Sequence, residues 1–496
     1  MLKLAFISFD HFNTDAHDAT VQAGAIDVLV KCLQKAVDSE HGANEAEKLC
    51  KLIRVLLRCS EETATTTICS NMTEIVTLII RIVTSTCTME PTDKCSSEAM
   101  RLWMRMCISE ITLKAITAQD KLLLSIMRTI RSGPLFGMSV HLSALKFVVA
   151  LASYPDNRAA IMQVPGLIDV ILDQASNIVS SDVVVQCIKV IESLLCDAHN
   201  RADYLMRPRC IGVLVKLCRS QNASACLYAV GALRQLSIEA SMRQKVSGHE
   251  VLAALIRLVI IPAASVQIKL ECLQTISNLI CVRTAAHFMA YSGLLKELAK
   301  VATSNSSENV KALAARSIKR LSTHVHPRHD SHKELFEALN IMSFAQERLV
   351  RLWTARSLVE QSLLAGSSFL MVRTPIMMGI FIRLAASKYT DVKAATFEAL
   401  ANLSQEPANA RRISMNDDIL ELLVHTIRVE SNLESGSSRQ AVRAVLLMAS
   451  NRSSTKRIAK HLGLVSCLSR YGMSSDEDSE LKQAALHGVV VLAHLI

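Results

Sequence analysis

The stretch Asp391–Ile413, DVKAATFEALANLSQEPANARRI, contains a helical pattern that breaks and then resumes. As far as Ser404, Ala and Leu recur every three or four positions, which is typical of an amphipathic helix with one buried face. SQEPAN then interrupts the pattern, because Pro407 cannot continue the helix before it and Asn409 favours a turn. The stretch therefore predicts a long helix, a tight corner and a second, short helix.

The same pattern recurs along the chain at a nearly constant spacing. Apolar segments open near Gly24, Glu74, Asp120, Gly166, Cys210, Glu250, Gly293, Glu334, Pro375, Asp418 and Gly463. These positions are 50, 46, 46, 44, 40, 43, 41, 41, 43 and 45 residues apart, a period that is the signature of an α-solenoid. All except Cys210 are Gly, Asp, Glu or Pro, which favour helix starts. The sequence therefore predicts an all-α, right-handed α-solenoid of about eleven stacked units.

Three short motifs occupy fixed places in these units. They are Ala399–Ser404 (ALANLS) in a long helix, Asn157-Arg158 and Asn200-Arg201 at corners, and Gln22–Val30 (QAGAIDVLV) after a corner. Together they resemble the armadillo repeat, whose pattern runs approximately A-x-x-A-L-x-N-L-S, a corner with N-R, and A-G-x-I-x-x-L-V-x-L-L. The resemblance is weakest at residues 40–130 and 324–380, where HEAT-like units are the alternative. It implies a single armadillo-repeat superhelix over residues 1–496.

Both ends of the sequence match partial units. Residues 2–26 resemble a third helix and its corner, and the final ELKQAALHGVVVLAHLI resembles a third helix with nothing after it. Solenoid ends need polar caps, whereas Leu4 and Ile496 would lie on outer faces. We therefore expect a longer natural chain or a partner that covers the ends, including self-association through the uncapped ends.

The composition indicates the cellular setting. The 496 residues carry a formal net charge of +10, spread along the chain, which is compatible with acidic partners. The 15 Cys include no Cys-x-x-Cys pair and lie mostly in apolar runs, as expected for buried, reduced thiols. No signal peptide or apolar run of about 20 residues is present. We expect a cytoplasmic or nuclear protein with no membrane insertion.

Candidate sites for chemistry are few. His324, His326, His329 and His332 lie in THVHPRHDSH, a set that could bind zinc or copper. Pro327 favours a loop and no Cys joins the set, so we interpret residues 324–332 as a His-rich connector and predict no metal site. No phosphate-loop, dinucleotide, zincin or nucleophile-elbow motif occurs. We expect no enzymatic activity, no catalytic residues and no cofactor.

The two tryptophans lie in helical segments, RLWMRM and RLWTAR, where packing between helices is the default interpretation. Nuclear-import adaptors of the armadillo family carry a Trp with an Asn four residues later, repeated along their groove. Neither Trp103 nor Trp353 has that Asn. The pattern therefore argues against an import receptor.

The resemblance also implies where a partner binds, because the third helices of armadillo units line a concave groove. Aligning the third helices on Asn402 selects positions one turn apart on the same helix face. The residues predicted to bind a partner are Arg101, Arg105, Lys146, Lys189, Gln235, Gln274, Asn278, Arg316, Arg320, Glu398, Asn402 and Arg443. Seven of these twelve are basic.

These features favour a non-catalytic protein–protein interaction scaffold that binds an extended, acidic partner segment in its groove. One alternative is a transport or trafficking adaptor. Another is an RNA-binding solenoid, which the low aromatic content of 4% disfavours, so nucleic acid is not the expected partner. A third is the interaction region of a larger ubiquitin-ligase-type protein.

Overall fold

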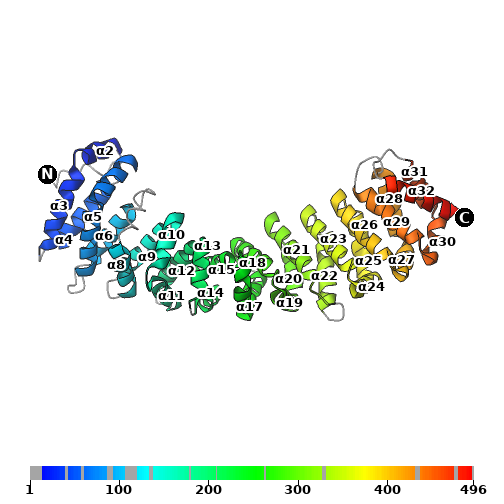
Figure 1. Cartoon of the computed structure of the whole chain (residues 1–496), viewed down its shortest axis with the longest axis horizontal. Coiled ribbons are helices and arrows are strands. Elements are labelled where there is room, and N and C mark those ends of the chain that lie inside the picture. Colours follow the sequence, from blue (N-terminus) through cyan, green and yellow to red (C-terminus); the bar gives the residue numbers. More distant parts are fainter. Residues whose placement is uncertain are drawn as a thin grey trace. The chain divides into compact units, whose positions relative to one another are not determined.

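The computed structural model describes residues 14–39, 43–56, 61–85, 93–106, 120–132, 138–177, 180–207, 209–261, 264–326, 331–430, 436–473 and 479–493. In these ranges every regular element is a helix, which confirms the all-α prediction. The chain divides into two compact units, Met1–Val246 and Ser247–Ile496. Each is a run of stacked helices (Figure 1). The predicted third helix within residues 2–13 lies outside the described residues.

The described part of the first unit begins with five helices, of which α5 is the longest at 25 residues. These are α2 (Thr14–Gln22), α3 (Ala25–Asp38), α4 (Ala43–Leu56), α5 (Glu61–Ser85) and α6 (Asp93–Met106). The rest of the unit contains α8 (Asp120–Ser132), α9 (Met138–Ser153), α10 (Pro155–Gln163), α11 (Leu167–Ser176), α12 (Ser181–Leu195), α13 (Ala198–Leu205), α14 (Cys210–Cys218), α15 (Ala223–Ser237) and α16 (Ala240–Val246).

The second unit continues the same alternation of short and long helices. Its first half contains α17 (His249–Ile260), α18 (Val266–Leu279), α19 (Arg283–Ala290), α20 (Leu294–Ala302), α21 (Glu308–Ser322), α22 (Ser331–Ser343), α23 (Arg348–Ser362) and α24 (Ala365–Arg373). Its second half contains α25 (Pro375–Ala385), α26 (Thr390–Ser404), α27 (Pro407–Ser414), α28 (Asp417–Glu430), α29 (Gly436–Ala449), α30 (Arg452–Lys460), α31 (Leu462–Gly472) and α32 (Ser479–Ala493).

Within each unit, each repeat stacks on the next, helix by helix. Third helices pack against third helices, as α9, α12 and α15 do in the first unit and α21, α23, α26 and α29 do in the second. Second helices form their own layer, in which α11 contacts α14 and α25 contacts α28. The segment Asp391–Ile413 forms most of α26, a corner and most of α27, with Pro407 in the first turn of α27.

One predicted helix start is wrong. A helix was expected to open near Glu74, but α5 runs without a break over Glu61–Ser85. Residues 61–85 contain no Gly or Pro, so nothing in this segment ends the helix at the expected corner. The other ten predicted starts lie at or within a few residues of described helix starts.

Four of the described corners before second helices adopt a left-handed backbone. Gly24, Gly166 and Gly293 adopt φ of 82°, 77° and 77°, a conformation that glycine reaches without steric cost. Before α14 the same position is Arg209, with φ of 67°. Cys210, the exception among the sequence landmarks, is therefore the first residue of α14, and Arg209 occupies the place that glycine holds in the other three corners.

Replacing Arg209 with glycine is expected to stabilise the first unit. A non-glycine residue in this conformation destabilises the folded state by about 1–2 kcal/mol. Glycine removes this strain, but it also raises the conformational entropy of the unfolded chain, which offsets part of the gain. The expected net increase in the free energy of unfolding is about 0.5–1 kcal/mol. The Arg209 side chain is exposed, so little packing is lost. Chemical denaturation followed by circular dichroism should show a higher midpoint. Gly166→Ala is the matched control and should lower it; equal midpoints for all three proteins would contradict the prediction.

The Asn-Arg corners hold third-helix ends in place. Nε of Arg158 donates to the carbonyl of Ala152 (2.9 Å), and Nε of Arg201 donates to that of Leu195 (2.8 Å). The last carbonyls of a helix have no partner within the helix, so these guanidinium groups supply donors that the corner would otherwise lack. Arg243 makes the same contact with Ser237 (2.9 Å) without being preceded by Asn.

Most described thiols are buried and unreactive. Burial raises the pKa of Cys187 to about 12 and that of Cys226 to about 11, so both remain protonated at neutral pH. Cys32, Cys69 and Cys281 are exposed, whereas eight of the described cysteines are buried, as the sequence predicted for most of them. In the described ranges no single helix is long and apolar enough to cross a bilayer. The helices Gly366–Arg373 and Pro375–Ala385 are together long and apolar enough to cross a bilayer, but they meet at a bend of 85°.

Candidate partner-binding groove

A surface hollow of about 340 Å³ lies across three successive third helices of the second unit. Its lining comes from α18, α21 and α23: Leu270, Gln274, Asn309, Ala312, Leu313, Arg316, Leu349 and Trp353. The residues from each helix follow the spacing i, i+3, i+4 and i+7, so they share one helix face. We call this feature the α18–α21–α23 hollow. It includes two of the residues predicted to bind a partner, Gln274 and Arg316.

Trp353 is the aromatic residue in the lining of the hollow. Its side chain is half-buried, and Leu349, one turn earlier, is 39% exposed. Trp103, by contrast, is 1% exposed and stacks on Phe147 at 5.2 Å, as predicted for a tryptophan that packs between helices. The difference arises because Trp353 lies on the outer face of α23 and Trp103 on the inner face of α6.

Two arginines flank the Trp353 ring. The guanidinium carbon of Arg316 lies 5.7 Å from the ring centroid and that of Arg356 lies 5.6 Å from it. Both side chains are exposed, and neither forms an ion pair with any described residue. Contacts of this kind stabilise a cation modestly, by about 0.5–1 kcal/mol at exposed sites. Both cations therefore remain free to bind an anion.

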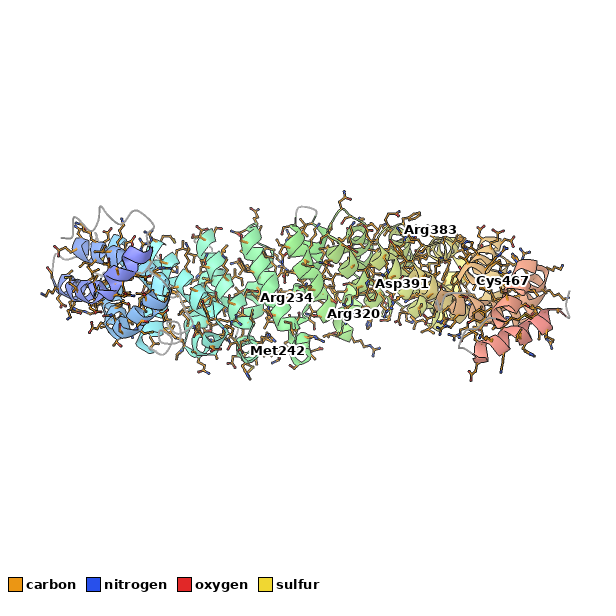
Figure 2. The ribbon with its side chains drawn as sticks, turned by 90° about the horizontal axis from the view of Figure 1, so that it is seen from above. Arg234, Met242, Arg320, Arg383, Asp391 and Cys467 are labelled. Carbon is orange, nitrogen blue, oxygen red and sulfur yellow. The ribbon has the colours of Figure 1, made fainter. Side chains whose placement is uncertain are left out.

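Other charges around the hollow are already paired. Lys311 contacts Glu347 at 2.6 Å, and the hydrogen bond from Lys311 lowers the pKa of that carboxyl. Lys319 contacts Glu360 at 2.6 Å. Arg348 donates to Asp391 through Nε (3.0 Å) and Nη2 (2.9 Å), which raises the pKa of Arg348; Asp391 is labelled in Figure 2. Because these cations are paired with carboxylates, the positive charges of Arg316 and Arg356 beside Trp353 are the ones left without a described ion-pair partner.

The predicted site residues of the second unit are only partly brought together. Gln274 and Arg316 line the hollow. Arg320 (Figure 2) instead turns toward α18, where its guanidinium donates to the Ser277 hydroxyl (3.0 Å) and to Sγ of Cys281 (2.7 Å). The remaining predicted residues lie on α18, α26 and α29, where Asn278, Glu398 and Asn402 are half-buried and Arg443 is exposed. Nδ2 of Asn402 donates to Oγ of Ser362 (3.2 Å).

In the first unit, the predicted residues lie on four third helices, α6, α9, α12 and α15. Arg101 is held by Glu98 at 2.6 Å, and the ammonium of Lys189 lies 5.0 Å from the ring centroid of Tyr228. Lys146 is exposed and Arg105 is half-buried. Gln235 is only 8% exposed, so a partner cannot reach it and its assignment to the groove is corrected. The cause is its place on the inner face of α15, between buried neighbours at 233 and 236.

Arg356 is not among the residues predicted to bind a partner, because the resemblance to the repeat is weak over residues 324–380 and gives no register for the helix there. A usable signal was present. Serines end α21, α23 and α26 at positions 322, 362 and 404, which fixes the register of the intervening helix. In that register Arg356 is equivalent to Arg316 and to Glu398, and so belongs to the predicted row.

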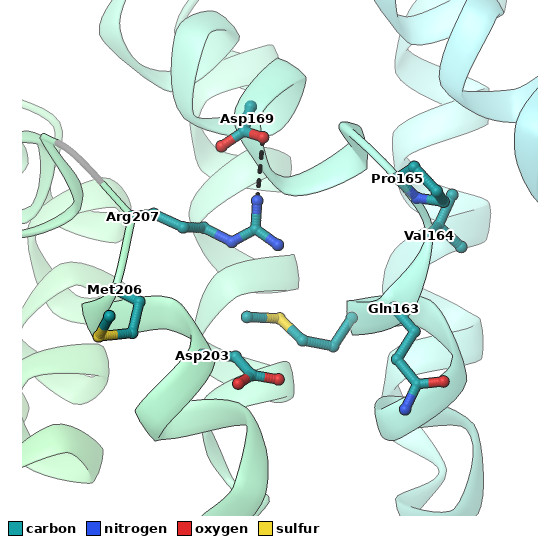
Figure 3. A pocket seen from close by; sticks show the side chains of 8 residues that line it. Gln163, Val164, Pro165, Asp169, Asp203, Met206 and Arg207 are labelled. Carbon is teal, nitrogen blue, oxygen red and sulfur yellow. Dashed lines mark hydrogen bonds and ion pairs between the residues drawn. The ribbon is translucent and has the colours of Figure 1, made fainter.

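A second pocket, of about 460 Å³, lies in the first unit between the corners that follow α10 and α13 (Figure 3). Arg207 reaches into it and donates through Nη1 to Asp169 (2.9 Å). The pocket also contains the exposed carboxylate of Asp203 and the exposed side chain of Met206. It therefore combines both signs of charge without a strong excess of either.

Among the described histidines of the predicted His-rich connector, one is buried. His332 belongs to α22 and is 3% exposed, with Nε2 at 2.9 Å from Oγ of Ser367. Nε2 of Gln361 donates to the carbonyl of Ser322 (2.6 Å), so this buried network links α21, α22, α23 and α24. His324 is half-buried, His326 is exposed, and His329 lies outside the described residues. Within the described part of the chain, no cluster of three metal-ligating side chains occurs.

A comparison with protein-family models finds no match, and a comparison with curated proteins finds none. Solved structures do match. An engineered protein is 17% identical, with a TM-score of 0.55, and the match covers 94% of this chain and 99% of that one. A chain from work on the phosphorylation switch in the interaction between cadherin and beta-catenin is 15% identical, with a TM-score of 0.55 and coverage of 88% and 90%. A designed armadillo repeat protein matches 48% of this chain and 99% of its own at 16% identity, with a TM-score of 0.40.

At these identities the matches speak to the fold alone. They agree with the helix order and with the packing of third helix on third helix within each unit. Solenoids of this kind present long surfaces that typically bind proteins. The chain is therefore an α-solenoid of stacked helical repeats, the fold that the resemblance of its sequence to the armadillo repeat implied.

Proposed function

We propose that the chain is a non-catalytic scaffold that binds an extended, acidic segment of a partner protein along its third helices. The observation that carries this proposal is the pair of unpaired arginines, Arg316 and Arg356, on either side of the half-buried Trp353 ring. An exposed apolar surface often marks a binding site, and two uncompensated cations beside it attract a partner of negative charge.

A protein segment is favoured over RNA by the make-up of the hollow. Single-stranded RNA binds by stacking successive bases on aromatic rings along a basic groove. The lining of the hollow contains one aromatic ring, and its other apolar residues are Leu and Ala. Aliphatic side chains suit the apolar side chains of a peptide and offer no platform for a second base.

Reversing both cations is expected to weaken binding of acidic segments. Peptides would first be selected from a random displayed library with the full chain. The double variant Arg316→Glu/Arg356→Glu should then bind the selected peptides about five- to thirtyfold more weakly, because two attractive contacts become repulsive at about 0.2–1 kcal/mol per exposed pair. Affinity for the original chain should also fall as salt rises, since the charges are exposed.

The matched control is Arg411→Glu/Arg412→Glu. It changes the net charge by the same amount, but both residues are exposed on α27, a first helix. It should leave the affinity unchanged. The proposal is wrong if the selected peptides are not acidic, or if both double variants weaken binding equally. A uridine decamer that binds more tightly than the best peptide would favour the RNA-binding alternative.

A further inference from the structure

We infer that the α18–α21–α23 hollow recognises a large aliphatic side chain, such as Leu or Ile, with a carboxylate two residues before or after it in an extended segment. This inference rests on the proposed function, because it names the residues that the scaffold selects at this site. It goes beyond net charge, since the hollow contributes a shape and a spacing as well as two cations.

The apolar lining of the hollow is the reason to expect an aliphatic side chain in the bound segment. Leu270, Ala312, Leu313, Leu349 and Trp353 line it with carbon atoms, and its volume of about 340 Å³ lies at the small end of ligand pockets. Leu349 and Trp353 keep part of their surface in water when the hollow is empty. A branched aliphatic side chain that fills this space removes apolar surface from water on both partners.

Two carboxamide side chains of the hollow are the reason to expect that the bound segment has an extended backbone. Gln274 from α18 and Asn309 from α21 line the hollow, and neither side chain forms a hydrogen bond with any described residue. Each carboxamide offers two donors and an acceptor. An extended segment leaves its own N–H and C=O groups unpaired, so the two amides can bind a peptide backbone on either side of the aliphatic residue.

The spacing follows from the geometry of extended chains. Successive side chains of an extended segment point to opposite faces, and residues two apart share a face at about 6.5–7 Å. Arg316 and Arg356 lie within 5.7 Å of the Trp353 ring centroid, so both can reach the same face as the residue that occupies the hollow. A carboxylate at the second position therefore meets a guanidinium, whereas a carboxylate at the adjacent position points away.

Binding can be followed through Trp353 itself, since the chain contains only two tryptophans. The probe peptide is Gly-Ser-Glu-Ser-Leu-Ser-Glu-Ser-Gly, titrated into the full chain while tryptophan fluorescence is recorded. The Trp353→Phe chain retains Trp103 and supplies the blank. Three control peptides replace Leu by Ala, replace both Glu by Gln, or move both Glu next to Leu with the composition unchanged.

The probe peptide is expected to change the fluorescence of the original chain, to leave the Trp353→Phe chain unchanged, and to bind at least tenfold more tightly than each control. Equal binding of the Ala peptide would overturn the aliphatic requirement, and equal binding of the rearranged peptide would overturn the spacing. A phosphoserine peptide that binds more than tenfold more tightly than the probe would overturn the assignment to a carboxylate.

The same measurements separate this inference from the proposed function. If the probe fails while library-selected acidic peptides bind and are lost in Arg316→Glu/Arg356→Glu, the inference falls and the scaffold remains. If no acidic peptide responds to that double variant, both fall. Retention of the helical circular dichroism signal in every variant shows that the losses arise from the binding surface.

Discussion

Replacing Arg201 with alanine is expected to lower the stability of the first unit by about 3 kcal/mol. The side chain is 7% exposed, and its three nitrogens all have partners. Nε donates to the carbonyl of Leu195 (2.8 Å), Nη2 donates to that of Cys196 (3.0 Å), and Nη1 pairs with Glu239. The substitution therefore leaves two helix-end carbonyls and a partly buried carboxylate without their charged donor.

Arg243→Ala is the matched control for this prediction. Arg243 donates to the carbonyls of Ser237 (2.9 Å) and Ile238 (2.7 Å) from the next corner, but it is half-buried and forms no ion pair there. Its loss should cost about 1–2 kcal/mol. The free energies of opening can be measured by hydrogen exchange of the amides in α12 and α13, because a repeat array does not unfold in a single step. An Arg201→Ala chain that opens no more readily than Arg243→Ala would contradict the role assigned to Glu239.

The α-solenoid fold could be predicted from the sequence because each repeat contains the same local sequence signals. Proline or glycine at a corner, Asn-Arg after it and apolar residues at helical spacing act on neighbouring residues, so they require no knowledge of distant contacts. The helix start predicted near Glu74 was wrong because residues 61–85 have the apolar spacing of a repeat but contain no residue that ends a helix. Arg209 shows the converse: the stacked repeats impose a left-handed corner on a residue that does not favour it.

The candidate site was less readable, because exposure depends on how helices turn against their neighbours. Arg320 and Arg316 are one turn apart on α21, yet Arg320 reaches back to the end of α18 and Arg316 remains unpaired beside Trp353. No local pattern distinguishes these two arginines. Trp353 and Trp103 lie in similar sequences, but a rotation of the helix face places one in the hollow and the other in the core.

Acidification from pH 7.5 to pH 5 is expected to destabilise both units through buried histidines. His141 in α9 is 2% exposed and His332 in α22 is 3% exposed, and burial lowers the pKa of each below 6.5. The folded state therefore holds neutral imidazoles, whereas the unfolded chain binds protons as pH falls through about 6.5. Each histidine lowers the free energy of unfolding by up to about 1.4 kcal/mol per pH unit until the pH reaches its folded pKa.

Leucine at the two positions should separate this titration from packing. Neither ring nitrogen of His141 has a hydrogen-bond partner among the described residues, so His141→Leu should raise stability at pH 7.5 by about 1–2 kcal/mol. His332→Leu removes the contact with Ser367 and should lower it by about 1 kcal/mol. Despite these opposite signs at neutral pH, both variants should lose less stability on acidification than the original chain. Urea midpoints at several pH values measure both effects, and an unchanged pH dependence in the two variants would show that other groups control the acid response.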